Sequence, residues 1–172
     1  MKLTYGEAKK QCLKMQDELK PKSDLTDKLP GFFDAAQKEV AQYYPIWRTQ
    51  NYDYMDERIL PADCWKPWSI THGCFTWFWT DDTKFDGLPD RFALKYKAWP
   101  QTITAETPDS YELETQEEAV LAVIYLVAAM CQQMEYDQRY FSTFYSQYQG
   151  KMQNLMGDSQ GVAVVVSTDF DI

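Results

Sequence analysis

The sequence predicts a mainly α protein: a bundle of about four helices with a small antiparallel β insertion and an extended C-terminal tail. Three observations lead to this prediction. Apolar residues recur at helical spacing near both ends of the chain, in 1–45 and 112–158. The middle, 46–111, alternates turn formers with short β-rich runs. The last residues, 159–172, are β-prone and follow a candidate helix cap at Gly157. We therefore expect a single domain over 1–158, followed by an extended tail over 159–172.

Helices are expected near residues 5–19, 31–44, 115–135 and 138–156, with a polar loop over 20–28. Thr4 with Glu7, and Thr115 with Glu118, have the spacing of capping boxes, in which two side chains satisfy free backbone N–H groups. The run AVLAVIYLVAAMC is apolar on nearly every side, which is typical of a helix at the centre of a bundle. We expect the core to contain Leu121, Ile124, Tyr125, Ala128 and Phe144.

The insertion should contain at least one antiparallel pair that includes residues 91–99. Phe92, Leu94, Tyr96 and Ala98 alternate there with mostly polar residues, which indicates a half-buried strand. A second β-rich run, CFTWFW, ends in Trp77 and Trp79. Residues two apart on a strand share a face, so these two indoles are candidates for partner binding.

Composition narrows the function. The formal net charge is −9, which argues against a reader of DNA, because such proteins need a basic face, but fits a surface past which DNA slides. Aromatic residues make up 16% of the chain, and some are expected to face partners. The longest apolar run, 119–131, is shorter than the roughly 20 residues of a membrane span, so no membrane role is expected.

Candidate chemistry is sparse, and we expect no enzyme, no cofactor and no metal site. His72 with Cys64 and Cys74 lacks the fourth ligand that structural zinc requires. Ser69 with His72 lacks the surroundings of a nucleophile elbow. Aspartate pairs at 81–82 and at 169 and 171 are candidate cation ligands, yet Asp is also a common turn residue. The shared face of Trp77 and Trp79 leaves open a carbohydrate-stacking platform.

Several strings, in this order, resemble the head–tail adaptor (connector or head completion) proteins of tailed bacteriophages. They are LPGFFDAAQKEVAQYY at 29–44, LPADC at 60–64, FALKYKAWPQTITAETPDSYEL at 92–113, and the long helical run at 117–155. In such proteins a helix pair is followed by a small β insertion, then by a Y-E-L-type segment that enters a long apolar helix. The similarity covers residues 3–156.

The resemblance implies a non-enzymatic subunit of a ring, typically a dodecamer, in the neck of the virion. Such a ring docks under the portal protein, continues the channel for double-stranded DNA and carries the next neck or tail protein. Projecting loops of the insertion are expected to present acidic side chains to this channel, with Asp81, Asp82 and Asp86 as candidates. The tail lies outside the shared pattern, but its β-prone residues predict that it adds as a strand to a neighbouring subunit or to the portal. Its candidate contact residues are Val162, Val164, Val166 and Phe170, and the alternative is that it folds back and pairs with its own β insertion. The alternative function is a carbohydrate-binding module of a phage fibre or cell surface.

Overall fold

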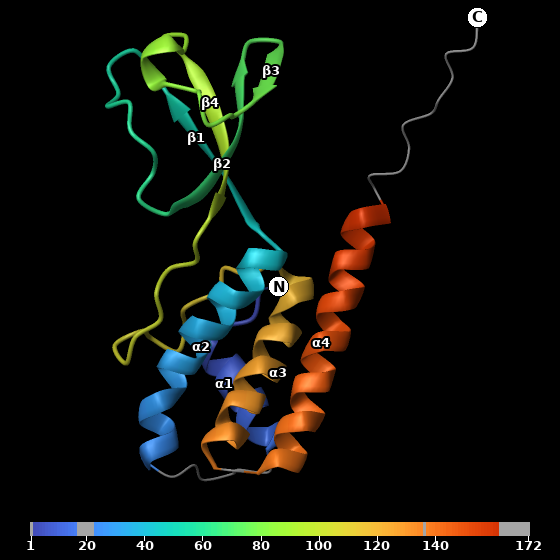
Figure 1. The fold of residues 1–172 in the computed structure, drawn as a ribbon. Helices are drawn as coiled ribbons and strands as arrows, with labels where there is room; N and C mark the ends of the chain where they lie inside the picture. The colour runs from blue at the N-terminus through green and yellow to red at the C-terminus, as the bar shows by residue number, and fades with distance from the viewer. Residues whose placement is uncertain (1, 17–22, 136, 162–172) are drawn as a thin grey trace, which may run out of the picture. The chain divides into compact units, whose positions relative to one another are not determined.

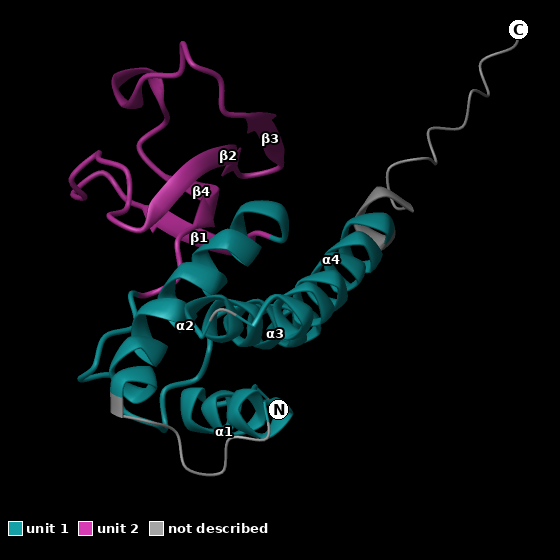
Figure 2. Cartoon of the chain, turned by 60° about the horizontal axis from the view of Figure 1, so that its bottom comes forward, with its two compact units in different colours: residues 1–44, 102–172 teal, residues 45–101 magenta. Residues whose placement is uncertain are grey.

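The computed structural model describes residues 2–16, 23–135 and 137–161. In the last two of these ranges, the side chains described are those of residues 24–135 and 137–157. The chain divides into two compact units, a helical unit of residues 1–44 and 102–172 and a sheet unit of residues 45–101 (Figure 2). The sheet unit is thus inserted between the second and third helices. The predicted tail contacts Val162, Val164, Val166 and Phe170 lie outside the described residues.

The helical unit contains α1 (Tyr5–Met15), α2 (Ser23–Tyr43), α3 (Glu117–Met134) and α4 (Gln138–Gly161). Helix α3 lies between α2 and α4 and also packs on α1 (Figure 1). Its position explains its composition, because a helix contacted on three sides buries apolar side chains around most of its circumference. Of the expected core, Ile124, Ala128 and Phe144 are buried and Tyr125 is half-buried, but Leu121 is 39% exposed.

Helix α2 begins at Ser23, so the predicted helix start near residue 31 is wrong. The predicted polar loop over 20–28 is also wrong for residues 23–28, the part of it that the structure describes. The helix continues through Pro30, which removes one backbone donor. Burial explains why it does so: Leu25 and Leu29 are each 2% exposed and extend the apolar stripe that continues at Phe33. Burying a leucine side chain contributes roughly 1.5–3 kcal/mol, so two leucines offset the cost of one proline.

The first predicted capping box is confirmed and the second is wrong. Glu7 N–H donates to Thr4 Oγ1 at 3.3 Å, and Thr4 N–H donates to Glu7 Oε2 at 3.0 Å. Helix α3 instead starts after Gln116, which makes no side-chain cap, and Thr115 is buried at 2% exposure. Thr115 is thus buried one residue before the start of the helix and does not cap it.

The sheet unit is a four-stranded antiparallel sheet with the order β1-β4-β2-β3. Its strands are β1 (Ile46–Tyr52), β2 (Cys64–His72), β3 (Phe75–Phe78) and β4 (Phe92–Ala98), with a short 3-10 turn, η1 (Phe85–Gly87). The predicted strand at 91–99 is confirmed: β4 pairs antiparallel with both β1 and β2.

The expected fold class is wrong. The chain is an α+β protein whose sheet forms a unit of its own, not a mainly α bundle with a small insertion. Two of the four strands escaped prediction because their residues do not alternate. In β1 only the terminal Ile46 and Tyr52 are buried, and β2 contains Pro67 and two irregularities in its register with β4. Each irregularity breaks the period of two on which strand prediction depends.

One helix in the described part of the chain, α3, is long and apolar enough to cross a membrane, with a hydropathy of 1.3 over its 18 residues. However, 61% of that window is buried inside the protein. The core helix of a globular unit meets the same criteria of length and composition, so this helix is weak evidence for a membrane.

Gly6 is the glycine whose replacement should disturb the helical unit. Its N–H donates to Asp109 O at 2.9 Å, and a Cβ at this position would lie 2.8 Å from Asp109 Cβ. We expect Gly6→Ala to lower the free energy of unfolding by roughly 1–3 kcal/mol, because the backbone at Asp109 must move. Urea denaturation would measure the change. Gly150→Ala is the control: a Cβ there meets nothing within 4 Å, and the variant should gain roughly 1 kcal/mol.

Candidate functional site

The sheet has one apolar face. Phe92, Leu94, Tyr96 and Ala98 of β4 are buried on it, and the rings of Tyr52 and Phe92 stack with centroids 4.8 Å apart. Phe85 of η1 covers this pair, and Trp79 contacts Phe85 edge to face at 5.3 Å. Arg58 donates to the carbonyl oxygens of Phe85 at 3.1 Å and Leu88 at 3.0 Å, which holds this turn in place. Tyr52 and Phe92 belong to the core of the sheet unit, and the half-buried rings of Phe85 and Trp79 cover it.

Asp63 organises the end of the sheet where β2 begins. Its carboxylate accepts from Tyr96 Oη at 3.2 Å and forms an ion pair with Arg48, and its carbonyl accepts from Trp99 N–H at 2.8 Å. Burial, followed by the nearby Asp63 carboxylate, raises the pKa of Tyr96 to about 12. The phenol therefore stays protonated and donates to Asp63 across the physiological range.

The opposite face of the sheet carries lysines and exposed aromatic rings. We call it the Lys–Trp face; its residues are Trp47, Trp65, Lys66, Trp68, Phe78, Lys95 and Lys97. Lys95 and Lys97 alternate with the buried residues of β4, so both project from this face. Trp47 is 38% exposed, Trp68 39% and Phe78 67%. Trp68 contacts Trp47 at 5.5 Å and Phe78 at 5.7 Å, so the three rings form a continuous aromatic surface.

Two bulges in β2 position the tryptophans of this face. The register with β4 shifts between Cys64 and Lys66 and again between Pro67 and Ser69, so Trp65 and Trp68 are the extra residues. A bulge redirects the side chain it contains. Here it brings both indoles toward Lys97, whose Nζ lies 5.5 Å from the ring centroids of Trp65 and Trp68.

Lys97 is the central cation of the face. Its Nζ also lies 5.5 Å from the ring centroid of Trp47, so three indoles surround one ammonium group. Lys95 Nζ lies 4.9 Å from the ring centroid of Trp47. Desolvation, followed by the like charge of Lys66, lowers the pKa of Lys97. Cation–π contacts offset part of that unfavourable environment.

The structure places the residues selected from sequence as follows. Trp79 is half-buried and contacts Phe85 on the apolar side of the sheet, and Trp77 is half-buried on β3 opposite Ile70. The exposed aromatic platform therefore lies on the opposite face, around Trp47 and Trp68. Asp81, Asp82 and Asp86 are exposed between β3 and β4. That they face a DNA channel stays a prediction.

Sequence reasoning missed Trp47, Lys95 and Lys97 as site residues. The alternation along β4 already placed the two lysines on one face, so this part of the signal was present in the sequence. The position of Trp47 depended on β1, which was not predicted. The partnership of Trp47 with Lys97 arises only from the register that pairs them across β1 and β4.

The histidine and cysteine candidates do not converge. His72 Nδ1 lies 2.5 Å from Arg91 O at the end of β2, and Ser69 is 6% exposed. Among the described residues, no group of three or more His, Cys, Asp and Glu side chains is arranged to hold a metal ion.

Asp53 and Arg91 form an exposed pair near the end of the sheet: Arg91 Nε donates to Asp53 Oδ1 at 3.0 Å. Hydrogen bonds from Tyr54 N–H and then Arg91 lower the pKa of Asp53.

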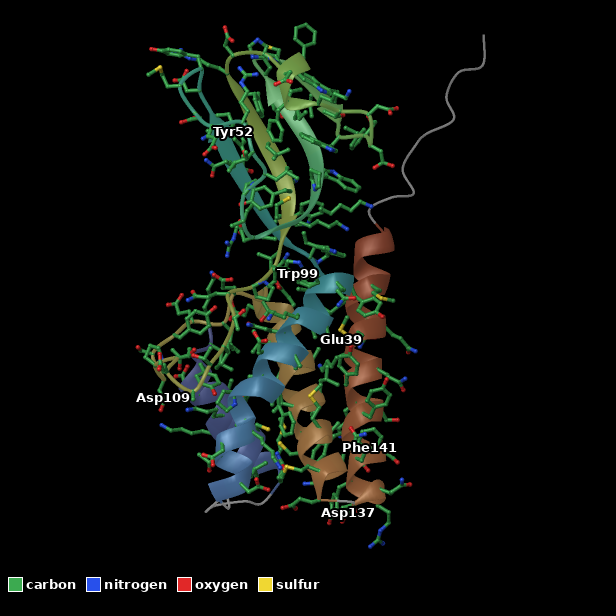
Figure 3. The ribbon with its side chains drawn as sticks, turned by 60° about the vertical axis from the view of Figure 1, so that its left-hand side comes forward. Glu39, Tyr52, Trp99, Asp109, Asp137 and Phe141 are labelled. Carbon is green, nitrogen blue, oxygen red and sulfur yellow. The ribbon has the colours of Figure 1, made fainter. Side chains whose placement is uncertain are left out.

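A groove of about 220 Å³ lies in the helical unit between α2 and α4. Glu39 and Tyr43 line it from α2, and Tyr145, Tyr148 and Met152 from α4. Tyr43 is 54% exposed and Tyr145 38%. Burial, followed by the nearby Glu39 carboxylate, raises the pKa of Tyr148 to about 12. Figure 3 shows the surrounding side chains, with Glu39 labelled on α2 and Phe141 on α4.

Comparison of the chain with protein-family models and with curated proteins gave no match in either case.

Proposed function

We propose that this protein is a subunit of a head–tail adaptor ring of a tailed bacteriophage. In this role it docks to the portal protein, continues the DNA channel and presents a platform to the next neck or tail protein. It acts in the neck of the virion without enzymatic chemistry. The observation that carries the proposal is the insertion of a β unit between the second and third helices of a helical unit, in the order that the resemblance implies.

The segments behind the resemblance support the proposal by their places in the fold. The string at 29–44 lies in α2 and the residue that follows it, 92–113 covers β4 and the segment after it, and 117–155 covers α3 and most of α4. They form the framework of both units. A shared pattern of packing residues is the expected signature of a structural protein whose role is shape and contact.

Exposed aromatic side chains are a second support. In the sheet unit, Trp47, Trp68 and Phe78 are each at least 38% exposed and form one aromatic surface. Large apolar surfaces exposed together mark interaction sites, and tyrosine and tryptophan are enriched in the centres of interfaces. An adaptor subunit has at least three such contacts: a neighbouring copy on each side, and the portal.

Deleting residues 159–172 tests the docking role of the tail. We expect the shortened chain to keep its helical circular dichroism, because the described core ends at Leu155, and to bind the portal more weakly. Native mass spectrometry and negative-stain electron microscopy, with the portal encoded in the same structural gene cluster, would measure ring formation. Equal assembly of the full and shortened chains would exclude a docking role for the tail.

A carbohydrate-binding module is the second candidate function. The exposed rings of Trp47, Trp68 and Phe78 favour it, because flat aromatic surfaces stack on sugar rings. Quenching or shift of tryptophan fluorescence by a glycan, lost in Trp68→Ala, would support this function over the adaptor.

The DNA channel has a separate test. Tight binding of DNA by the protein at physiological salt would contradict the proposed passage of DNA through an acidic channel.

A further inference from the structure

The lysines of the Lys–Trp face make no ion pair with any carboxylate in the part of the chain that the structure describes. Lys66 and Lys95 are exposed and Lys97 is half-buried. Three ammonium groups next to exposed aromatic rings thus form a cationic surface on a chain whose net charge is −9.

The register makes this surface electrostatically unfavourable in the isolated chain. Lys66 and Lys97 are direct partners across β2 and β4. Like charges directly opposite on neighbouring strands destabilise a sheet. An anionic partner placed over the face would remove this repulsion, and the aromatic rings around Lys97 would exclude water from the contact and strengthen it.

Charge is distributed unequally between the two units. The sheet unit has seven Lys and Arg against eight Asp and Glu, a net charge of −1, while the helical unit has ten against eighteen, a net charge of −8. The most acidic stretch is 102–118, with six acidic and no basic residues. Figure 3 shows this irregular segment around Asp109. Asp109 pairs with Lys9, while Glu106, Glu112 and Glu118 are exposed.

We propose that the Lys–Trp face of one copy binds the acidic segment 102–118 of a second copy. Charge complementarity between two surfaces of the same chain selects this partner. The contact joins different surfaces on the two copies, so it is heterologous, and heterologous contacts generate rings when the rotation closes. This inference rests on the proposed ring and identifies which surfaces form it. Lys66, Lys95 and Lys97 provide the charge, and Trp47, Trp68 and Phe78 the apolar area.

Carbodiimide cross-linking tests the contact directly, because it joins an amine to a carboxylate only when the two are close enough to form an ion pair. We would mix full-length chains with natural and with ¹⁵N-labelled nitrogen, cross-link them at low salt and identify the peptides by mass spectrometry. The expected result is mixed-isotope peptides that join Lys66, Lys95 or Lys97 to 102–118. Their absence, or cross-links confined to single chains, would overturn the proposal.

Neutralising each surface separately gives a second readout. The face variant is Lys66→Gln, Lys95→Gln and Lys97→Gln; the segment variant is Glu106→Gln, Glu112→Gln and Glu118→Gln, which leaves the Asp109–Lys9 pair intact. If each of three ion pairs contributes about as much as an exposed pair, self-association should weaken roughly threefold to hundredfold in each variant. Mixed together, the two variants retain one native contact and should form a 1:1 dimer that does not extend.

Matched controls separate the contact from general effects of charge. Replacing the same three lysines with arginine keeps the charge, so association should persist. Replacing Lys10 and Lys14, both exposed on α1, with glutamine should leave it unchanged. Association of the face variant at the wild-type level, or a mixture that stays monomeric, would refute the proposed contact.

The outcomes for the contact and for the adaptor function are distinguishable. Portal binding with normal rings in the face variant would overturn the contact and leave the adaptor function intact. Self-association through the face without any portal binding would support the contact and overturn the adaptor function. If the face variant instead loses binding to an oligonucleotide or an acidic glycan while its self-association is unchanged, the face serves that ligand and the contact is wrong.

Discussion

Phe33→Ala should lower the free energy of unfolding of the helical unit by roughly 3–5 kcal/mol. The Phe33 ring is fully buried in α2 and meets Tyr5 of α1 edge to face, with centroids 5.3 Å apart and an interplanar angle of 86°. Its removal leaves a cavity between these helices and deprives Tyr5 of an aromatic partner. Because a domain has only about 5–15 kcal/mol of net stability, this loss is a large fraction of the total.

Urea denaturation followed by circular dichroism at the helical band would measure this change. Phe32→Ala is the matched control, since it removes the same side chain from the adjacent, half-buried position on α2. Phe32→Ala should lower the free energy of unfolding distinctly less than Phe33→Ala does. A cost below about 1 kcal/mol for Phe33→Ala would mean that α1 and α2 do not pack as described.

Leu94→Ala should lower the stability of the sheet unit by roughly 2–5 kcal/mol. Leu94 has no exposed surface and lies on β4, paired with Gln50 of β1 and Ile70 of β2. It therefore anchors the three strands that make up most of the sheet. Hydrogen exchange with mass spectrometry locates the effect, and the largest loss of amide protection should fall within 46–98.

Leu60→Ala makes the same chemical change in the same unit at a residue that is 40% exposed. It should leave protection in the strands nearly unchanged, because little apolar surface is lost to water. A uniform loss of protection in both variants would show that Leu94 is not part of a specific sheet core.

Local patterns predicted the elements that depend on neighbours in sequence. The capping box of Thr4 and Glu7, the burial of Phe144 in the last helix and the alternation of β4 all follow from spacing along the chain. Predictions failed where distant contacts decided. Leu25 and Leu29 extend α2 through Pro30 because other helices bury them, and Thr115 loses its capping role to burial.

The candidate site shows the same division. Alternation along β4 determined by itself that Lys95 and Lys97 share a face, and composition determined the acidic stretch at 102–118. Only tertiary structure decided that Trp47, Trp65 and Trp68 surround Lys97, because their positions depend on strand pairing and on two bulges in β2. Tertiary structure likewise decided that Trp79 packs against Phe85 and that the sheet is a separate unit. Spacing along a chain encodes which side chains share a face, whereas strand register, bulges and burial depend on free energies summed over residues far apart in sequence.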